Sequence, residues 1–119
     1  MTACRLVAEP AVDADVEAAF RWYEHENPGL GLEFLDELRS TYARVAAAPL
    51  SYRDLRGGIR RALLRRFAYA VYFAVDGSTV VVLTVLHAHR DPAAWQRRTS
   101  STHPIPPPSW RAPLPATSQ

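Results

Sequence analysis

The chain has 119 residues, of which 48% are hydrophobic and 22% charged. This length and composition are typical of one folded domain and leave too little chain for a second core. The single cysteine, Cys4, excludes an intrachain disulfide and a cysteine-based metal cluster. No secretory signal is evident, and the longest apolar stretch, residues 80–86, is too short to span a bilayer. We therefore expect a cytoplasmic protein that needs neither a metal nor a cofactor.

The net charge of +2 is distributed unevenly along the sequence. Residues 1–50 contain four arginines and nine acidic residues, a net charge of −5, whereas residues 51–119 contain ten arginines and three acidic residues, a net charge of +7. A basic half favours an anionic partner, either a nucleic acid or an acidic protein segment. All fourteen basic residues are arginine, which is typical of biased coding, so their distribution is more informative than their identity.

The first half of the sequence predicts a short strand followed by two helices. Residues 4–9 have the composition of a strand, and a proline ends it. Residues 12–23 carry apolar side chains at helical spacing, with acidic residues at the start that suit the positive end of the helix dipole. Asn27 and Pro28 are typical of a helix cap and a first helical position, and Pro49 is expected to stop this second helix. The short connection makes the two helices an antiparallel hairpin.

The second half of the sequence changes from a helical to an extended pattern. Residues 59–66 and 69–75 predict two strands, and the second of these has alternate apolar side chains on one face. Asp76 and Gly77 are typical of a two-residue hairpin loop. Residues 79–87 predict a further strand, which is so apolar on both faces that we place it at the centre of the sheet.

The C-terminal part of the sequence predicts a short helix and then a tail. Residues 92–98 favour a short helix around Trp95, whereas residues 99–119 hold six of the ten prolines and read as disordered or loosely extended. The predicted fold class is α+β, in the order β-α-α-β-β-β: an antiparallel sheet of about four strands with an N-terminal helical hairpin packed on one face. The opposite face would then be free to bind a partner. Residues 1–98 form the predicted domain, and residues 99–119 form the appended tail.

A cluster of arginines marks a candidate partner-binding surface. Arg60, Arg61, Arg65 and Arg66 lie on or beside one predicted strand. The guanidinium group binds phosphate and carboxylate through a planar fork of donors, so these side chains are candidate contacts with RNA or with an acidic peptide. We add Trp95 to the set as an aromatic contact. The alternative is an ordinary solvated strand face.

A histidine segment at the end of the last strand marks the candidate catalytic residues. His87 and His89 are two residues apart and share a face of an extended strand, and Arg90 follows them. A histidine can act as the general acid or base in phosphodiester cleavage while an arginine stabilises the developing charge. The alternative is that His87 makes a hydrogen bond within the fold. A metal site is not expected, because no further histidine or cysteine cluster completes one.

Several short segments, taken in their order along the chain, resemble one protein family. They are Ala19-Phe20 and Tyr23, Asn27-Pro28, Phe34-Leu35 and Leu38, Arg60-Arg61, the residues 66–73, and the residues 82–92 followed by Trp95. Together they resemble the RelE/ParE toxins of type II toxin–antitoxin systems, and most closely the ParE-like, plasmid-stabilisation branch. The resemblance covers residues 4 to about 98. The Phe-Pro-Tyr usual in this branch reads Phe67-Ala68-Tyr69 here, and the proline-rich tail lies outside the family pattern.

The resemblance implies a toxin that is neutralised by a cognate antitoxin protein in a hetero-oligomeric complex. RelE-like members of the superfamily cleave mRNA on the ribosome, using basic residues on the sheet and often a terminal tyrosine or histidine. ParE-like members inhibit DNA gyrase and are not established as enzymes. The chain has no lysine to match the nuclease cluster, so we favour growth inhibition through gyrase. A ribosome-dependent endoribonuclease and a non-toxic relative that only binds its antitoxin are the alternatives.

Overall fold

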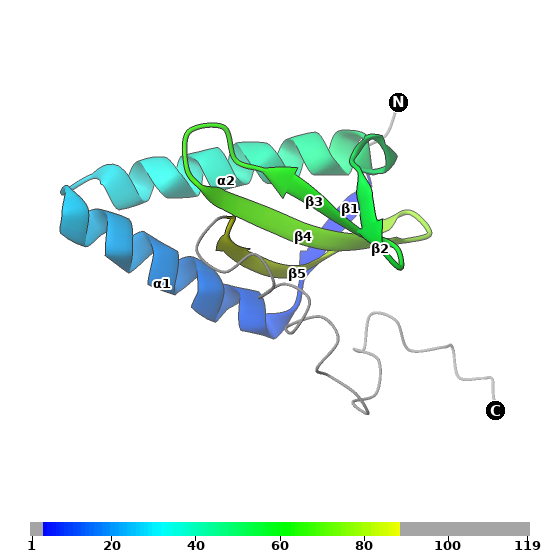
Figure 1. Ribbon diagram of the computed structural model, residues 1–119, viewed down its shortest axis with the longest axis horizontal. Helices are drawn as coiled ribbons and strands as arrows, with labels where there is room; N and C mark the ends of the chain where they lie inside the picture. The colour runs from blue at the N-terminus through cyan, green and yellow to red at the C-terminus, as the bar shows by residue number, and fades with distance from the viewer. Residues whose placement is uncertain (1–3, 89–119) are drawn as a thin grey trace.

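The described part of the chain folds as two helices and a five-stranded sheet (Figure 1). The computed structural model describes residues 4–88. In chain order the elements are β1 (Arg5–Ala8), α1 (Pro10–Glu26), α2 (Leu30–Ala47), the 3-10 turn η1 (Pro49–Ser51), β2 (Asp54–Arg56), β3 (Ile59–Leu63), β4 (Tyr69–Asp76) and β5 (Thr79–His87). The predicted α+β class and the helical hairpin are confirmed. No helix within these residues is long and apolar enough to cross a membrane.

The sheet is mixed and has five strands, in the order β1-β5-β4-β3-β2. It therefore differs from the predicted antiparallel sheet of about four strands in two respects. First, β1 pairs with β5 in parallel, while the other neighbours are antiparallel. Second, β2 is an additional edge strand. Its three residues place a single apolar side chain between two charged ones, so no alternating pattern marks it in the sequence. The strand predicted for the centre, β5, is an interior strand between β1 and β4, and the centre of the five is occupied by β4.

The hydrophobic core lies between the helical hairpin and one face of the sheet. On β4, the alternate residues Tyr69, Val71 and Phe73 are buried there, as the sequence pattern predicts. Aromatic rings from four segments meet at the hairpin end of this core: Tyr23 and Phe34 from the helices, and Phe67 and Tyr69 from the β3–β4 connection and β4. Their ring centroids lie 4.8–5.9 Å apart. Each such pair adds about 0.5–1.5 kcal/mol beyond the burial of its surface.

The opposite face of the sheet is not open at its centre, contrary to the expectation from the sequence. Ala70, Tyr72 and Ala74 of β4 and Val81 of β5 point to this side and are buried. Tyr72 and Ala70 form a second, smaller cluster with Ala88, which directly follows β5. Apolar residues on both faces explain why β4 and β5 read as nearly continuous apolar runs.

The connection between the helices differs from the predicted cap. The second helix begins at Leu30, and its N-cap position is Gly29, which has a left-handed backbone with φ of 92°. Asn27 makes no side-chain cap. Instead, the Glu24 carboxylate from α1 accepts hydrogen bonds from the Gly29 N–H (2.8 Å) and the Gly31 N–H (3.0 Å). The reason is geometric: a carboxylate on the preceding antiparallel helix reaches the unpaired donors at this helix N-terminus and satisfies two of them.

A glycine lets the two helices approach each other closely near this connection. A Cβ atom at Gly31 would lie 2.7 Å from Phe20 Cδ1 and 2.8 Å from Glu24 Oε1. Only a hydrogen atom fits at that position, so the hairpin end of the interhelical packing depends on a residue without a side chain.

Two strand boundaries also differ from the sequence-based expectation. The strand predicted at residues 59–66 ends at Leu63, so Arg65 and Arg66 lie in the connection to β4. The hairpin loop consists of Gly77 and Ser78 rather than Asp76 and Gly77, because Asp76 already pairs with the first residue of β5. Gly77 has a φ of 64°, the backbone region that tight hairpin loops require at their first position.

An acidic side chain completes the edge of β5. The short strand β1 pairs only with residues 79–82, so within residues 4–88 the second half of β5 has no strand neighbour on that side. There the Asp15 carboxylate of α1 accepts hydrogen bonds from the Thr84 hydroxyl (2.9 Å) and the Val85 N–H (3.2 Å). These donors follow an irregularity in the β4–β5 register. Asp15 thus supplies the acceptor that a longer strand would otherwise provide.

We predict that Asp15→Ala lowers the free energy of unfolding by about 1–3 kcal/mol, because it leaves the buried Thr84 hydroxyl and the Val85 N–H without their shared acceptor. Asp15→Asn is the matched control: its amide oxygen can still accept one of these bonds, so a smaller loss is expected. Urea denaturation of the two variants measures the difference. Equal stability of Asp15→Ala and the parent chain would contradict this role for Asp15.

Candidate functional site

The arginines that cluster in the sequence do not form one cluster in the structure. Arg60 pairs with Phe73 on the helix side of the sheet, and its guanidinium donates a hydrogen bond to the Tyr52 carbonyl. Arg61 pairs with Tyr72, whose side chain belongs to the opposite face. Alternation along a strand therefore separates two arginines that are adjacent in sequence.

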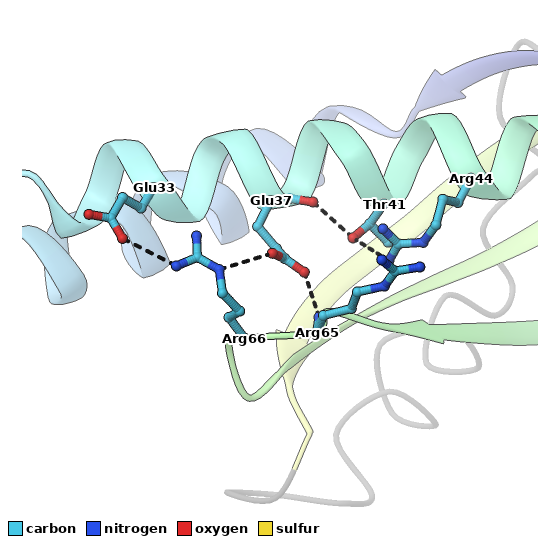
Figure 2. A network of polar contacts seen from close by, with 6 residues as sticks. All are labelled: Glu33, Glu37, Thr41, Arg44, Arg65 and Arg66. Carbon is cyan, nitrogen blue, oxygen red and sulfur yellow. Dashed lines mark hydrogen bonds and ion pairs between the residues drawn. The ribbon is translucent and has the colours of Figure 1, made fainter.

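Arg65 and Arg66 are held against α2 by two carboxylates (Figure 2). The Arg65 N–H donates to Glu37 Oε2 (2.5 Å), and the Arg66 guanidinium contacts Glu37 Oε1 (3.5 Å) and Glu33 Oε1 (3.3 Å). The Arg66 guanidinium also lies 5.3 Å from the centroid of the Phe67 ring. The side chain of Arg66 is still 57% exposed. These contacts fix where the connection runs and leave both guanidinium groups at the surface.

The same network continues along α2. The Thr41 hydroxyl donates to the Glu37 carbonyl oxygen (2.9 Å), and the Arg44 guanidinium donates to the Thr41 hydroxyl oxygen (3.2 Å). Figure 2 shows the side chains of Arg65 and Arg44 beside α2, next to Thr41 and Glu37. The surface beside α2 thus presents several guanidinium groups, although only Arg66 makes an ion pair with Glu37.

The Glu37 carboxylate is the centre of this network, and its side chain is only 10% exposed. Burial raises the pKa of Glu37, but the hydrogen bonds from the Arg65 and Arg66 backbones and the Arg66 guanidinium outweigh it, so the pKa lies below its ordinary value. Glu37 is therefore ionised at neutral pH, and its charge is bound to the β3–β4 connection.

The candidate catalytic histidine lies on the helix side of the sheet. His87 pairs with Tyr69 at the end of β5, and the two rings meet edge to face with centroids 5.3 Å apart. Its side chain is half-buried. The other candidates His89, Arg90 and Trp95 lie outside the described residues. Within residues 4–88, no three His, Cys, Asp or Glu side chains are grouped as metal ligands.

The structure contains a groove that the sequence analysis missed. It lies between α1 and α2, has a volume of about 350 Å³, and is lined by Ala8, Val12, Asp13, Val16, Glu17, Phe20, Leu35, Leu38 and Tyr42. No separate signal in the sequence marks this groove, because most of its lining residues belong to the apolar stripes that pack in or against the main core. Burial, together with the charges of Asp13 and Asp15, raises the pKa of Tyr42 to about 12. Its hydroxyl is therefore a neutral donor beside an acidic rim.

The family follows from comparison with known sequences. Residues 6–92 match the family model described as the ParE toxin of type II toxin–antitoxin system, parDE. The chain belongs to the ParE toxin family. The matched region runs from β1 through all the other described elements, so the family resemblance of the sequence is confirmed. No curated protein sequence matches the chain.

A solved structure shares the fold. The chain is similar to one from the structure "Chromosomal ParDE TA system from P. aeruginosa", with a TM-score of 0.64 and 17% sequence identity. The similarity covers 71% of this chain and 95% of that chain. At this identity the likeness shows the fold alone, and it agrees with the arrangement of the helical hairpin and sheet of this ParE-family toxin.

We predict that Glu37→Gln destabilises the toxin at neutral pH and not in acid. Because the folded-state pKa of Glu37 is lowered, its stabilising effect is present above the ordinary glutamate pKa and is lost as the pH falls through the folded-state value. We expect a loss of about 1 kcal/mol at pH 7. Glu33→Gln is the control, since the contact of Glu33 with Arg66 is exposed, whereas Glu37 is largely buried and also accepts the Arg65 N–H. A loss for Glu37→Gln that does not change with pH would contradict this assignment.

Proposed function

We propose that this ParE-family chain is a growth-inhibiting toxin that acts on DNA gyrase in the cytoplasm and is neutralised by a cognate antitoxin. The observation that carries the proposal is the family match, which extends over residues 6–92 and so includes every described helix and strand. Residues 1–98 act as the toxin domain, and residues 99–119 are an appended tail.

The positions of two side chains favour inhibition over RNA cleavage. A general acid or base must reach the proton that it transfers. His87 instead packs edge to face against Tyr69 on the helix side of the sheet. Tyr72, the last tyrosine in the sequence, is 2% exposed. Tyr72 pairs with Arg61 across the strands but is buried, and His87 lies on the other face of the sheet, so the two do not form an accessible acid–base pair beside Arg61. This arrangement supports the gyrase inhibitor over a ribosome-dependent endoribonuclease.

The charge distribution supports an acidic antitoxin segment. Residues 51–88 contain six arginines and two acidic residues, whereas α1 and α2 contain eight acidic residues and three arginines. An acidic segment is therefore attracted to the side of the molecule formed by β2, β3 and the β3–β4 connection. Arg61, Arg65 and Arg66 are the described candidates for this contact, because Arg60 is engaged with the Tyr52 carbonyl.

The proposed target is tested by producing the full chain without antitoxin. We expect DNA replication to stop and a DNA-damage response to appear while mRNA remains intact. In vitro, the purified chain should inhibit the supercoiling of relaxed plasmid by DNA gyrase. The double substitution His87→Ala with His89→Ala, checked for folding by circular dichroism, should remain toxic.

Two other results would overturn this target. Transcripts cut within codons soon after induction, and spared by the folded double variant, would identify an endoribonuclease with catalytic histidines. Normal growth and normal gyrase activity, with antitoxin binding retained, would identify a non-toxic relative.

We also predict that Arg61→Glu combined with Arg65→Glu slows association with the antitoxin by about tenfold or more at low salt and weakens the salt dependence of the rate. The matched control is Arg39→Glu, which reverses an exposed arginine of α2 that pairs with Asp36. Stopped-flow measurements with the protein encoded by the adjoining reading frame provide the rates. If both variants associate at the parent rate, the arginine side is not the docking surface.

A further inference from the structure

The groove between α1 and α2 has apolar walls and an acidic rim. Val16 and Phe20 of α1 face Leu35 and Tyr42 of α2 across it, and all four are only partly buried within the chain. Two aromatic rings and two aliphatic side chains therefore form a surface that a further apolar segment can cover.

One carboxylate at the rim has no partner among residues 4–88. Glu17 forms an ion pair with Arg21, one turn further along α1. Asp13 also lines the groove, yet it makes no hydrogen bond or ion pair within the described part of the chain. A cationic side chain entering the groove at this end would gain a favourable interaction with Asp13, and the hydroxyl oxygen of Tyr42 nearby could accept a hydrogen bond from it.

The sequence beyond the family match contains a segment with the complementary chemistry. The match ends at residue 92, and residues 104–115 then read Pro-Ile-Pro-Pro-Pro-Ser-Trp-Arg-Ala-Pro-Leu-Pro. Six prolines favour a polyproline II helix, which loses little conformational entropy when it binds an aromatic-lined groove. Trp110 and Leu114 supply apolar side chains, and Arg111 supplies the cation. Residues 89–119 carry four arginines and one acidic residue, opposite in sign to the helices.

The segment can reach the groove from the point where the described chain ends. Ala88 directly follows His87, which pairs with Tyr69, and Tyr69 contacts Tyr23 of α1 one helical turn after Phe20. Fifteen residues, 89–103, lie between Ala88 and residue 104. Fully extended, a connection of that length spans at most about 53 Å, which exceeds the length of about 25 Å of a 17-residue helix such as α1. Binding within the chain is thus favoured by a high effective concentration.

We propose that residues 104–115 of this chain dock in the α1–α2 groove, with Trp110 and Leu114 against the apolar walls and Arg111 paired with Asp13. The proposal does not depend on the toxin's target. Its consequence is regulatory, because the docked segment competes with any partner that needs the groove. That partner's apparent affinity is its intrinsic affinity multiplied by the fraction of molecules in which the groove is free.

The test uses the full chain with a nitroxide spin label at Ser118→Cys, in a Cys4→Ser background that leaves one cysteine. Methyl NMR reports paramagnetic broadening. We expect the signals of Val16 and Leu35 to lose more than half of their intensity, independently of protein concentration, while Leu55 at the far edge of the sheet keeps its signal. Trp110→Ser with Arg111→Glu should restore the signals of Val16 and Leu35, and the matched control Arg97→Glu should not.

A charge exchange completes the test. Arg111→Asp should reduce the broadening, and adding Asp13→Arg should recover it, a result that a general loss of tail structure would not produce. Three outcomes would overturn the proposal. They are broadening that ignores Trp110 and Arg111, broadening that appears at Leu55 instead, and broadening that scales with protein concentration, which would mean that a second copy supplies the tail.

Discussion

The aromatic cluster at the hairpin end of the core is the contact on which the other features depend. Tyr23, Phe34, Phe67 and Tyr69 join both helices to the β3–β4 connection and to β4, with the closest pair of rings, Tyr23 and Phe67, 4.8 Å apart. Because Phe67 is anchored there, the arginines just before it are brought to the surface of α2. Because Tyr69 is anchored there, the end of β5 has a fixed position beside it. The aromatic cluster therefore positions the candidate residues Arg65, Arg66 and His87, although none of these three is a buried core residue.

Acidic side chains on the helices accept hydrogen bonds from backbone N–H groups that the helices and strands leave without an acceptor. Glu24 closes the start of α2, Asp15 replaces the missing continuation of β1, and Glu37 holds the β3–β4 connection. Each is an acidic side chain on a helix that accepts backbone N–H groups of another segment. The surplus of acidic residues in the first half of the chain is thus partly structural. Because these acidic residues lie on the helices, the arginines of the second half give the sheet side of the molecule a positive charge.

The helical hairpin has two surfaces with different uses. Both helices cover the sheet, and between them lies a groove of about 350 Å³ with an acidic rim, lined in part by the same core residues. The family match ends at residue 92, before the proline-rich segment that we propose as the occupant of this groove. A toxin domain with a surface that its own tail can cover has a means of regulating access that needs no change in the core.

The sequence by itself determined the α+β class, the helical hairpin, the apolar face of β4 and the family, because these follow from periodicity and from the order of short segments. It did not reveal β2, whose three residues carry no alternating pattern, or the Glu24 cap, which depends on how the two helices meet. It also did not reveal the parallel pairing of β1 with β5, which joins segments more than 70 residues apart. The candidate site shows the same division. The arginines were identifiable as a basic cluster, but only the tertiary structure separated Arg60 from Arg61 and joined Arg65 and Arg66 to α2. Alternation along β3 places Arg60 and Arg61 on opposite faces of the sheet. Arg65 and Arg66 lie in the connection because β3 ends at Leu63, where its pairing with β4 ends.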